Sequence, residues 1–192
     1  MSLSKPALRN LMRARRAELS TDLRSQAAHA VADIFPREFG RAALSVAGYI
    51  PLGAEMDPGP LMAWLASQGA AILLPVVVTR GAALRFREAS DPASYVPDAA
   101  GILAPAPDAP EATPDLILAP LLAFDPFGGR LGQGGGYYDR TLAALRAGPG
   151  VLAVGLGFAV QEIDEVPRDP HDQFLDAICT EIGYRRVPRK DP

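Results

Sequence analysis

Four glycines within five positions mark the stretch of the sequence that is best suited to bind an anion. They lie between an apolar run that ends at Phe124 and a helical pattern that begins at Tyr138. Glycines allow backbone N–H groups to converge on an anion and allow φ to take positive values. The following helix adds the positive end of its dipole, and Arg130 adds a guanidinium. This arrangement predicts a phosphate-binding loop, with its glycines at Gly132, Gly134, Gly135 and Gly136.

The spacing of these glycines differs from two familiar phosphate-binding motifs. Tyr137 occupies the last glycine position of the dinucleotide fingerprint, and the Lys-Ser/Thr pair of a P-loop does not follow. On glycine content alone, an ordinary flexible turn is an alternative. The strand before the loop and the helix after it favour the anion-binding interpretation.

Basic residues recur every three or four positions in a predicted helix over residues 6–19. Residues at this spacing share one face of a helix. The row is therefore either a solvated basic face or a second anion-binding element. Its members are Lys5, Arg9, Arg13 and Arg16.

Strand-like and helical patterns alternate along the chain, which predicts crossover connections and a mainly parallel sheet. Further helices are expected after Ser20 and over residues 60–68 and 138–146. Strands are expected over residues 44–50, 72–78, 84–88, 116–124, 151–158 and 176–181.

We therefore expect one α/β domain over residues 1–192, a three-layer α/β/α sandwich with a central sheet. Residues 90–114 are predicted as a long loop and residues 185–192 as a frayed basic tail. In such sheets ligands bind beyond the carboxyl ends of the strands. The loops that follow Ile50, Phe124 and Phe158 are the expected sites.

The composition limits the class of protein. The formal net charge is −3, whereas proteins that grip long nucleic acids usually carry a basic surplus. One cysteine and two histidines exclude a disulfide framework and a cysteine-based zinc site. The apolar runs fall short of the ~20 residues that cross a bilayer. We expect a cytoplasmic monomer that acts on a small molecule, with neither a membrane nor a nucleic acid as partner.

Residues 130–139, with the sequence RLGQGGGYYD, resemble the signature of the 5-formyltetrahydrofolate cyclo-ligase family. The N-terminal residues 5–9, KPALR, resemble that family's Lys-x-x-Leu-Arg start. Three further segments resemble it in the same order: an acidic pair after a strand at 50–57, a strand with a Phe-Asp turn at 120–127, and a closing strand with an aspartate at 174–181. The resemblance therefore covers nearly the whole chain.

The resemblance implies an α/β enzyme that uses ATP and Mg²⁺ to close a reduced folate, 5-formyltetrahydrofolate, into 5,10-methenyltetrahydrofolate, with release of ADP and phosphate. It implies Mg²⁺ ligands at Asp139 and Asp176, and catalytic roles for Arg130, Gly134 and Tyr137. The implied folate contacts are Ile50, Glu55, Gln133, Gly134, Gly135, Gly136 and Tyr137. The implied ATP contacts are Lys5, Arg9, Arg130, Leu131, Gly132, Gln133, Gly134, Gly135, Gly136, Tyr137 and Tyr138.

The implied chemistry needs positioned charges rather than a nucleophilic serine or cysteine. Phosphorylation of the formyl oxygen makes it a leaving group, so that the second folate nitrogen can attack the same carbon. Mg²⁺ prefers a few carboxylates together with phosphate oxygens, which suits two aspartates. Glu55 offers two acceptors to the N–H edge of a pterin. A separate acidic pair, Asp169 and Asp172, is predicted only to cap a loop.

One position departs from the family pattern, because many relatives carry lysine where this chain has Gly135. The cations that remain for the γ-phosphate are Lys5, Arg9 and Arg130. Two other functions stay open: a sugar-phosphate enzyme on the same fold, and a non-catalytic regulator that binds folate or a nucleic acid.

Overall fold

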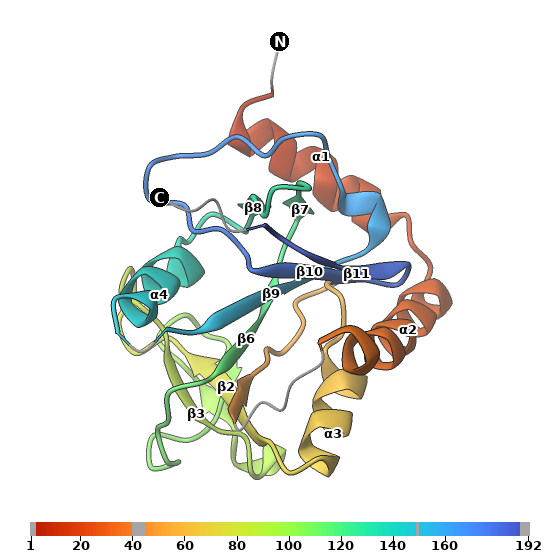
Figure 1. The fold of residues 1–192 in the computed structure, drawn as a ribbon. Helices are drawn as coiled ribbons and strands as arrows, with labels where there is room; N and C mark the ends of the chain where they lie inside the picture. Colours follow the sequence, from red (N-terminus) through yellow and green to blue (C-terminus); the bar gives the residue numbers. More distant parts are fainter. Residues whose placement is uncertain (1–2, 40–44, 149, 189–192) are drawn as a thin grey trace.

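A seven-stranded sheet forms the centre of the computed structural model, as far as it describes the chain, over residues 3–39, 45–148 and 150–188 (Figure 1). Five strands in the middle are parallel, and each edge strand is antiparallel to its neighbour. The strand order is β11-β10-β9-β6-β1-β2-β3. These strands are β1 (Ser45–Ala47), β2 (Ala71–Val76), β3 (Arg85–Glu88), β6 (Leu116–Pro120), β9 (Leu152–Leu156), β10 (Ala177–Thr180) and β11 (Gly183–Arg186).

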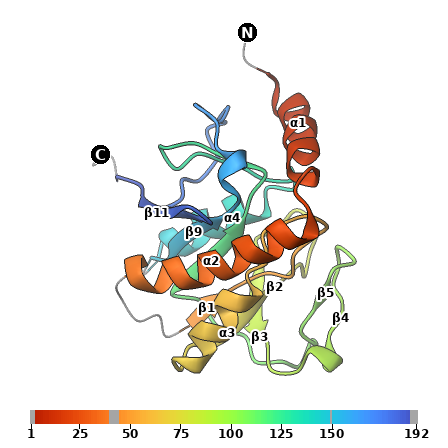
Figure 2. The same cartoon turned by 90° about the vertical axis from the view of Figure 1, so that its right-hand side faces the viewer.

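Helices cover both faces of this sheet. The helices α2 (Thr21–Phe39) and α3 (Gly59–Ser67) lie on one face, and α4 (Tyr137–Arg146) lies on the other (Figures 1 and 2). A further helix, α1 (Lys5–Ala17), lies beyond one end of the strands. The predicted α/β fold with a mainly parallel sheet between helical layers is therefore confirmed.

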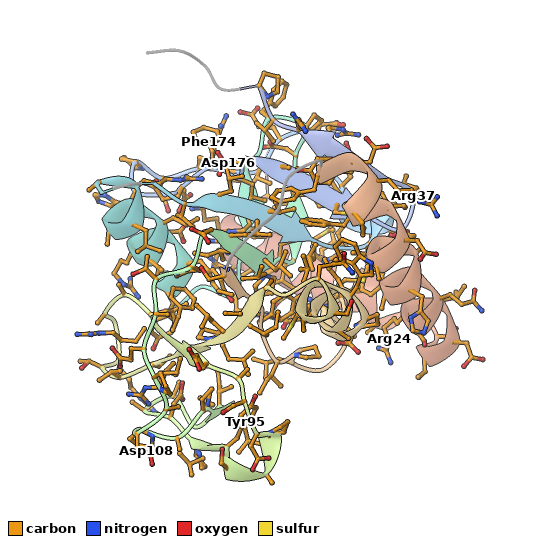
Figure 3. All side chains as sticks on the ribbon, turned by 60° about the horizontal axis from the view of Figure 1, so that its bottom comes forward. Arg24, Arg37, Tyr95, Asp108, Phe174 and Asp176 are labelled. Atoms are coloured by element: carbon orange, nitrogen blue, oxygen red, sulfur yellow. The ribbon has the colours of Figure 1, made fainter. Side chains whose placement is uncertain are left out.

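The central strand β6 shows why both faces need a cover. Leu116 and Leu118 join the apolar cluster under α2 and α3, whereas Ile117 and Ala119 join the cluster under α4. Successive side chains of a strand point to opposite faces, so an all-apolar strand is stable only when both faces are buried. Figure 3 shows the side chains that fill these layers, while the charged Arg37 on α2 points away from the sheet.

The apolar run predicted as one strand over residues 116–124 forms two. The chain bends after β6, and β7 (Ala123–Phe124) pairs instead with β8 (Arg130–Leu131) in a small antiparallel hairpin. The bend is held at Leu121 and Leu122, whose carbonyl oxygens accept hydrogen bonds of 3.0 and 2.9 Å from the buried Gln161 side chain. The glycine loop therefore begins from a hairpin and not directly from the central sheet.

The segment 90–114, predicted as an unstructured loop, contains an arm of regular structure. A turn of 3₁₀ helix (Pro92–Ser94) precedes a hairpin made of β4 (Val96–Pro97) and β5 (Leu103–Ala104), which stands beside β2 and β3 (Figure 2). Asp98 fastens it, because its carboxylate accepts hydrogen bonds from the backbone of Val77, Ala100 and Ile102. Figure 3 shows Tyr95 and Asp108 toward its outer end.

The prediction of a frayed tail over residues 185–192 is wrong for its first two residues. Arg185 and Arg186 belong to β11, which pairs with β10 and closes that edge of the sheet. Tyr184 in this strand packs edge-on against Phe35 of α2, with ring centroids 5.8 Å apart. This burial of an aromatic ring explains why the strand forms despite its basic residues. Residues 189–192 lie outside the described part of the chain.

Candidate active site

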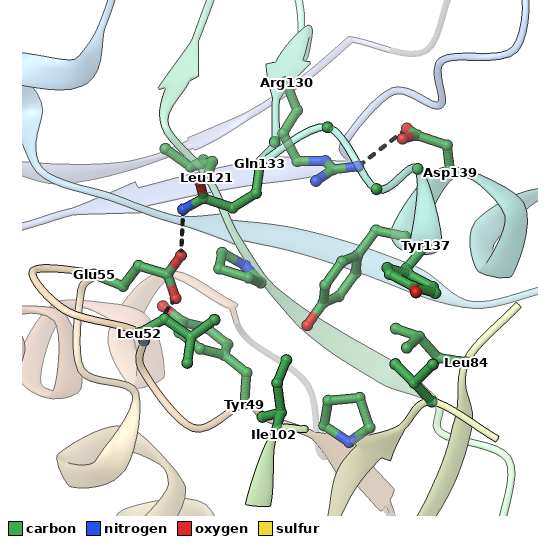
Figure 4. Close-up of a pocket in the computed structure, with 18 of the residues that line it drawn as sticks. Tyr49, Leu52, Glu55, Leu84, Ile102, Leu121, Arg130, Gln133, Tyr137 and Asp139 are labelled. Carbon is green, nitrogen blue, oxygen red and sulfur yellow. Dashed lines mark hydrogen bonds and ion pairs between the residues drawn. The ribbon is translucent and has the colours of Figure 1, made fainter. Parts of the chain in front are cut away.

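A cavity of about 490 Å³ opens at the carboxyl ends of the central strands (Figure 4). Its lining includes Tyr49 and Ile50 after β1, Leu121 after β6, and Asp169 and Asp172 from the segment between β9 and β10. These are the three connections in which the sequence predicts a ligand. The glycine loop and the β4–β5 arm complete the wall.

The two ends of this cavity differ in chemistry. One end carries charges, with Arg130 and Asp139 close together in Figure 4. The opposite end is apolar and includes Leu84 and Ile102. Glu55 lies at the side between them. Such a cavity suits a ligand, or a pair of ligands, with a charged end and a flat apolar end.

A buried aspartate shapes the turn that leads into the glycine loop. Both oxygens of Asp125 accept backbone hydrogen bonds: Oδ1 from Phe127 at 2.9 Å and from Gly129 at 2.8 Å, and Oδ2 from Val166 at 2.9 Å. A Cβ atom at Gly129 would lie 2.3 Å from Asp125 Oδ2, so only glycine fits there. Sequence reasoning missed this role, although the Asp-Pro dipeptide and the two glycines that follow Phe127 are recognisable turn signals.

The glycine loop contains two backbone conformations that L-residues rarely adopt. Gly134 has φ +107° and Gly136, the N-cap of α4, has φ +65°. Helix α1 holds the loop from outside, because Arg9 Nε donates to the carbonyl oxygen of Gly132 at 2.9 Å. Arg13 donates to the side-chain oxygen of Gln133, with its NH2 group at 3.0 Å. Arg9 and Arg13 of the basic row therefore contact the loop, Arg9 from a half-buried position and Arg13 from an exposed one.

Arg130 is a buried cation at the base of the loop. Its NH2 group donates to Asp139 Oδ1 at 3.0 Å, and its guanidinium lies 5.4 Å from the centre of the Tyr138 ring. Within the described residues its buried Nε has no hydrogen-bond partner. Burial raises the pKa of Tyr138 above its ordinary value, while Arg130 opposes the shift. The phenol therefore remains a protonated hydrogen-bond donor.

Lys5 at the start of α1 binds two carboxylates across the cavity mouth. Its Nζ lies 2.7 Å from Asp169 Oδ2 and 2.5 Å from Asp172 Oδ2. Partial burial acts to lower the pKa of Lys5, but the hydrogen bonds to both aspartates outweigh it and raise the pKa. Burial likewise acts to raise the pKa of Asp172, yet the hydrogen bonds from Lys5 and the Asp169 backbone, together with the positive charges of Lys5 and Arg130, outweigh it and lower the pKa. At neutral pH Lys5 and Asp172 are therefore both charged.

Glu55 is buried, with its carboxylate fixed on both oxygens. Oε1 accepts from Gln133 Nε2 at 3.0 Å, and Oε2 accepts from the backbone N–H of Leu52 at 3.0 Å. The neighbouring Tyr49 donates its hydroxyl to the carbonyl oxygen of Met56 at 2.6 Å. Each carboxylate oxygen can accept more than one hydrogen bond, so Glu55 retains acceptor capacity toward a ligand.

Comparison with known proteins decides the family. The model of the 5-formyltetrahydrofolate cyclo-ligase family matches residues 1–181. The chain belongs to this cyclo-ligase family. The Mycolicibacterium smegmatis 5-formyltetrahydrofolate cyclo-ligase is 35% identical over 147 residues, which cover 71% of this chain and 73% of that protein. The Escherichia coli cyclo-ligase is 32% identical over 141 residues, covering 71% of this chain and 77% of that protein.

A solved structure agrees with this membership in the cyclo-ligase family. The NMR structure of Aquifex aeolicus 5,10-methenyltetrahydrofolate synthetase is 28% identical to this chain, with a TM-score of 0.82. The match covers 99% of this chain and 96% of the Aquifex protein.

In the described residues of the present structure, none of the helices has the length and apolar character needed to span a membrane.

The structure brings together nearly all of the residues that the resemblance to the cyclo-ligase family implies, but it leaves out Asp176. Asp176 precedes β10 at the amino end of the strand, and its Oδ2 accepts from Arg146 at 2.7 Å and from the backbone N–H of Ala153 at 2.9 Å. Among the described residues of this region, the aspartates that line the cavity are Asp169 and Asp172. The structure therefore does not bring Asp139 and Asp176 together, since Asp139 lines the cavity and Asp176 is bound to Arg146 and Ala153 at the amino end of β10.

Gly135, where many cyclo-ligase relatives carry lysine, lies against an aromatic ring. A Cβ atom added there would lie 2.8 Å from Cδ2 of Tyr137, so a longer side chain requires this ring to turn. Arg140 lies over the same ring at 5.3 Å and donates to the carbonyl oxygen of Gly135 at 2.5 Å. The glycine therefore fits the local packing of Tyr137 and Arg140.

The positive φ at Gly134 makes a direct test of the loop conformation. We expect Gly134→Ala to cost on the order of 1–3 kcal/mol of backbone strain or to displace the loop. An ångström-scale displacement should weaken ATP binding about 10- to 100-fold, as measured by titration calorimetry. Gly69→Ala is the matched control, because Gly69 has φ +88° but lies after α3. Equal losses of ATP affinity in the two variants would contradict a specific role of the loop.

Proposed function

We propose that this cavity binds ATP and 5-formyltetrahydrofolate and closes the folate into 5,10-methenyltetrahydrofolate, with release of ADP and phosphate. The observation that carries the proposal is the placement of the glycine loop and Arg130 at the charged end of the cavity that also contains Glu55. Family membership and the similarity to the named relatives support the same activity.

The charged end is the proposed nucleotide site. Backbone N–H groups of residues 132–136 and the N-terminus of α4 offer donors to the phosphates. Lys5, Arg9 and Arg130 add positive charge from two other elements. Leu131, Gln133, Tyr137 and Tyr138 line the same region.

The folate is proposed to lie along Ile50, Glu55 and the loop. Glu55 would accept hydrogen bonds from the adjacent N–H groups of the pterin, because its ionised carboxylate presents two acceptors. The apolar residues Leu84 and Ile102 suit the flat rings of the substrate. This places the formyl group toward the charged end.

Asp139 and Asp172 fit the sparse protein ligation that Mg²⁺ prefers when it is bound together with phosphates. Both line the charged end, and the backbone N–H of Gln173, next to Asp172, donates to Asp139 Oδ1 at 3.2 Å. The described residues contain no cluster of three or more candidate metal ligands. When bound, Mg²⁺ would neutralise phosphate charge and orient the γ-phosphoryl group.

The reaction is proposed to proceed in two displacements. The formyl oxygen attacks the γ-phosphorus while the bond from this phosphorus to the bridging oxygen breaks and ADP leaves. The second folate nitrogen then attacks the formyl carbon, the carbon–oxygen bond breaks, and phosphate departs with the proton of that nitrogen. Arg130 and the Gly134 amide would stabilise charge on the transferred group, and Tyr137 would shield the reacting atoms from water.

The direct test mixes the purified protein with 5-formyltetrahydrofolate, ATP and Mg²⁺. We expect the near-ultraviolet absorbance of the methenyl product to appear together with one ADP per product. Omission of ATP is the control and should abolish the signal. Turnover of a sugar phosphate without methenyl formation would favour the sugar-phosphate enzyme, and folate binding without any turnover would favour the regulator.

The metal assignment separates two aspartates that lie close together in sequence. Asp172→Asn should raise the Mg²⁺ concentration for half-maximal activity by about tenfold or more, since a neutral amide is a poorer ligand for a hard cation. Asp176→Asn is the matched control and should lower the thermal midpoint, because it weakens the contact with Arg146, while the Mg²⁺ dependence stays unchanged. The reverse result would restore Asp176 to the metal site.

The role of Lys5 is tested by comparing the two substrates. Lys5→Ala should raise the KM for ATP roughly tenfold, a loss of about 1.4 kcal/mol, and the KM for the folate much less. Lys5→Arg, which keeps the charge, should recover most of the ATP affinity. A parallel rise of both KM values would show that Lys5 does not act on the phosphates.

A further inference from the structure

The basic row of α1 divides into two parts in the structure. Lys5 and Arg9 line the charged end of the cavity. Arg16, three turns beyond Lys5 along the helix, is absent from the cavity lining formed by the described residues. Its side chain is only 6% exposed, so it is neither a solvated charge nor a ligand contact. Another reason is required for a buried cation at this position.

The contacts of Arg16 point to Glu55. Its NH1 group lies 3.9 Å from Glu55 Oε1 and donates to the carbonyl oxygen of Leu121 at 3.3 Å. Its Nε is buried without a hydrogen-bond partner among the described residues. A buried guanidinium with an unsatisfied donor is costly, so its position is explained best by the opposite charge that it faces.

Glu55 in turn depends on such a partner. Its side chain is 5% exposed, and a carboxylate removed from water needs an opposite charge nearby to offset its lost hydration. Its two fixed hydrogen bonds come from Gln133 and Leu52, which are neutral donors. Arg16 is the cation within 4 Å of Glu55 in the described part of the chain.

We propose that Arg16 is a positioning residue that holds the Glu55 carboxylate in place and turned toward the folate. The inference rests on the proposed function, in which Glu55 binds the pterin. Arg16 touches no substrate. It anchors to the carbonyl of Leu121, where β6 ends, and so fixes the charge of Glu55 relative to the sheet.

The electrostatics of the pair agree with this role. Burial lowers the pKa of Arg16, and the charge of Glu55 opposes the shift. A guanidinium stays protonated even so, because its ordinary pKa lies above 12. The positive charge beside Glu55 is therefore present at neutral pH.

The test measures the affinities for both ligands in four variants and in the charge-conserving variant Arg16→Lys. Folate affinity is measured by calorimetry with a non-hydrolysable ATP analogue and Mg²⁺ present, and the affinity for the analogue is measured separately. The variants are Arg16→Met, Glu55→Gln, the combination of both, and Arg15→Met. Arg15 is the matched control, because it is an exposed neighbour on the same helix that donates to the carbonyl of Val160.

Arg16→Met should weaken folate binding about tenfold and change the affinity for the ATP analogue by less than about twofold. Arg15→Met should leave both affinities within about twofold of the original protein. In the Glu55→Gln background, Arg16→Met should have no further effect on the folate, because the two residues act as a unit. Arg16→Lys, which keeps the charge, should restore most of the folate affinity.

Three results would overturn the proposal: equal losses for both ligands in Arg16→Met, additive losses in the combined variant, or no loss at all. If Arg16→Met does not fold, Glu55→Gln is compared with the combined variant, in which no unpaired charge remains. Weaker folate binding in the combined variant than in Glu55→Gln would then refute a role through Glu55. If Glu55→Gln itself leaves folate binding unchanged, the proposed folate site fails and the positioning role falls with it.

Discussion

Charge pairing inside a partly buried cavity governs the arrangement of this site. A site for triphosphate needs cations, and cations held away from water need a counter-charge when the ligand is absent. Three pairings meet this need: Lys5 with two aspartates, Arg130 with Asp139, and Arg16 with Glu55. In the proposed function, the Lys5 and Arg130 pairings change their partners when the ligands bind. The cations then bind the phosphates, and the carboxylates bind Mg²⁺. The third keeps its partner, because its role lies with the folate.

The fold supplies this pairing from segments that are far apart in sequence. Arg9 and Gly132 are separated by 123 positions, yet the side chain of one binds the backbone of the other. The central sheet makes this possible, because its parallel strands all end at one edge and their following loops converge there. Helix α1 lies across that edge and closes it with charged contacts. The glycine loop is consequently held from two sides, by Asp125 at its start and by α1 along its length.

The sequence predicted the general architecture well and the individual side-chain partners less well. The alternation of apolar strands with helical periods identified the parallel sheet, since period and burial are local properties. The glycine loop was also visible, because residue type and spacing determine its conformation. The split of residues 116–124 at Leu121 was not predictable, since it depends on hydrogen bonds from Gln161, 40 positions away. Likewise, Tyr184 forms part of a strand because of Phe35, which no local pattern reveals.

The candidate site residues were likewise predicted only in part from the sequence. Lys5, Glu55 and Asp139 lie at the cavity as the resemblance to the family implied. Asp176 does not, because its segment passes the cavity earlier, at Asp169 and Asp172. The loop-capping role expected for Asp172 is present as well, since it accepts from the backbone of Asp169 at 2.8 Å. Sequence reasoning saw Arg16 only as one of four basic residues on a helix face, because the structure alone shows that it is buried.

The β4–β5 arm, which connects β3 to β6, leaves the central sheet and returns to it at one place. Glu88 donates its backbone N–H to Pro110 at 2.9 Å, and Ala112 donates to Phe86 at 3.1 Å, so the two stems run side by side. Loops closed in this way tolerate changes in length, because closure entropy grows only slowly with the number of residues. The arm can thus diverge over evolution without disturbing the sheet, and because Ile102 and Leu103 line the cavity, such divergence reshapes the apolar end alone.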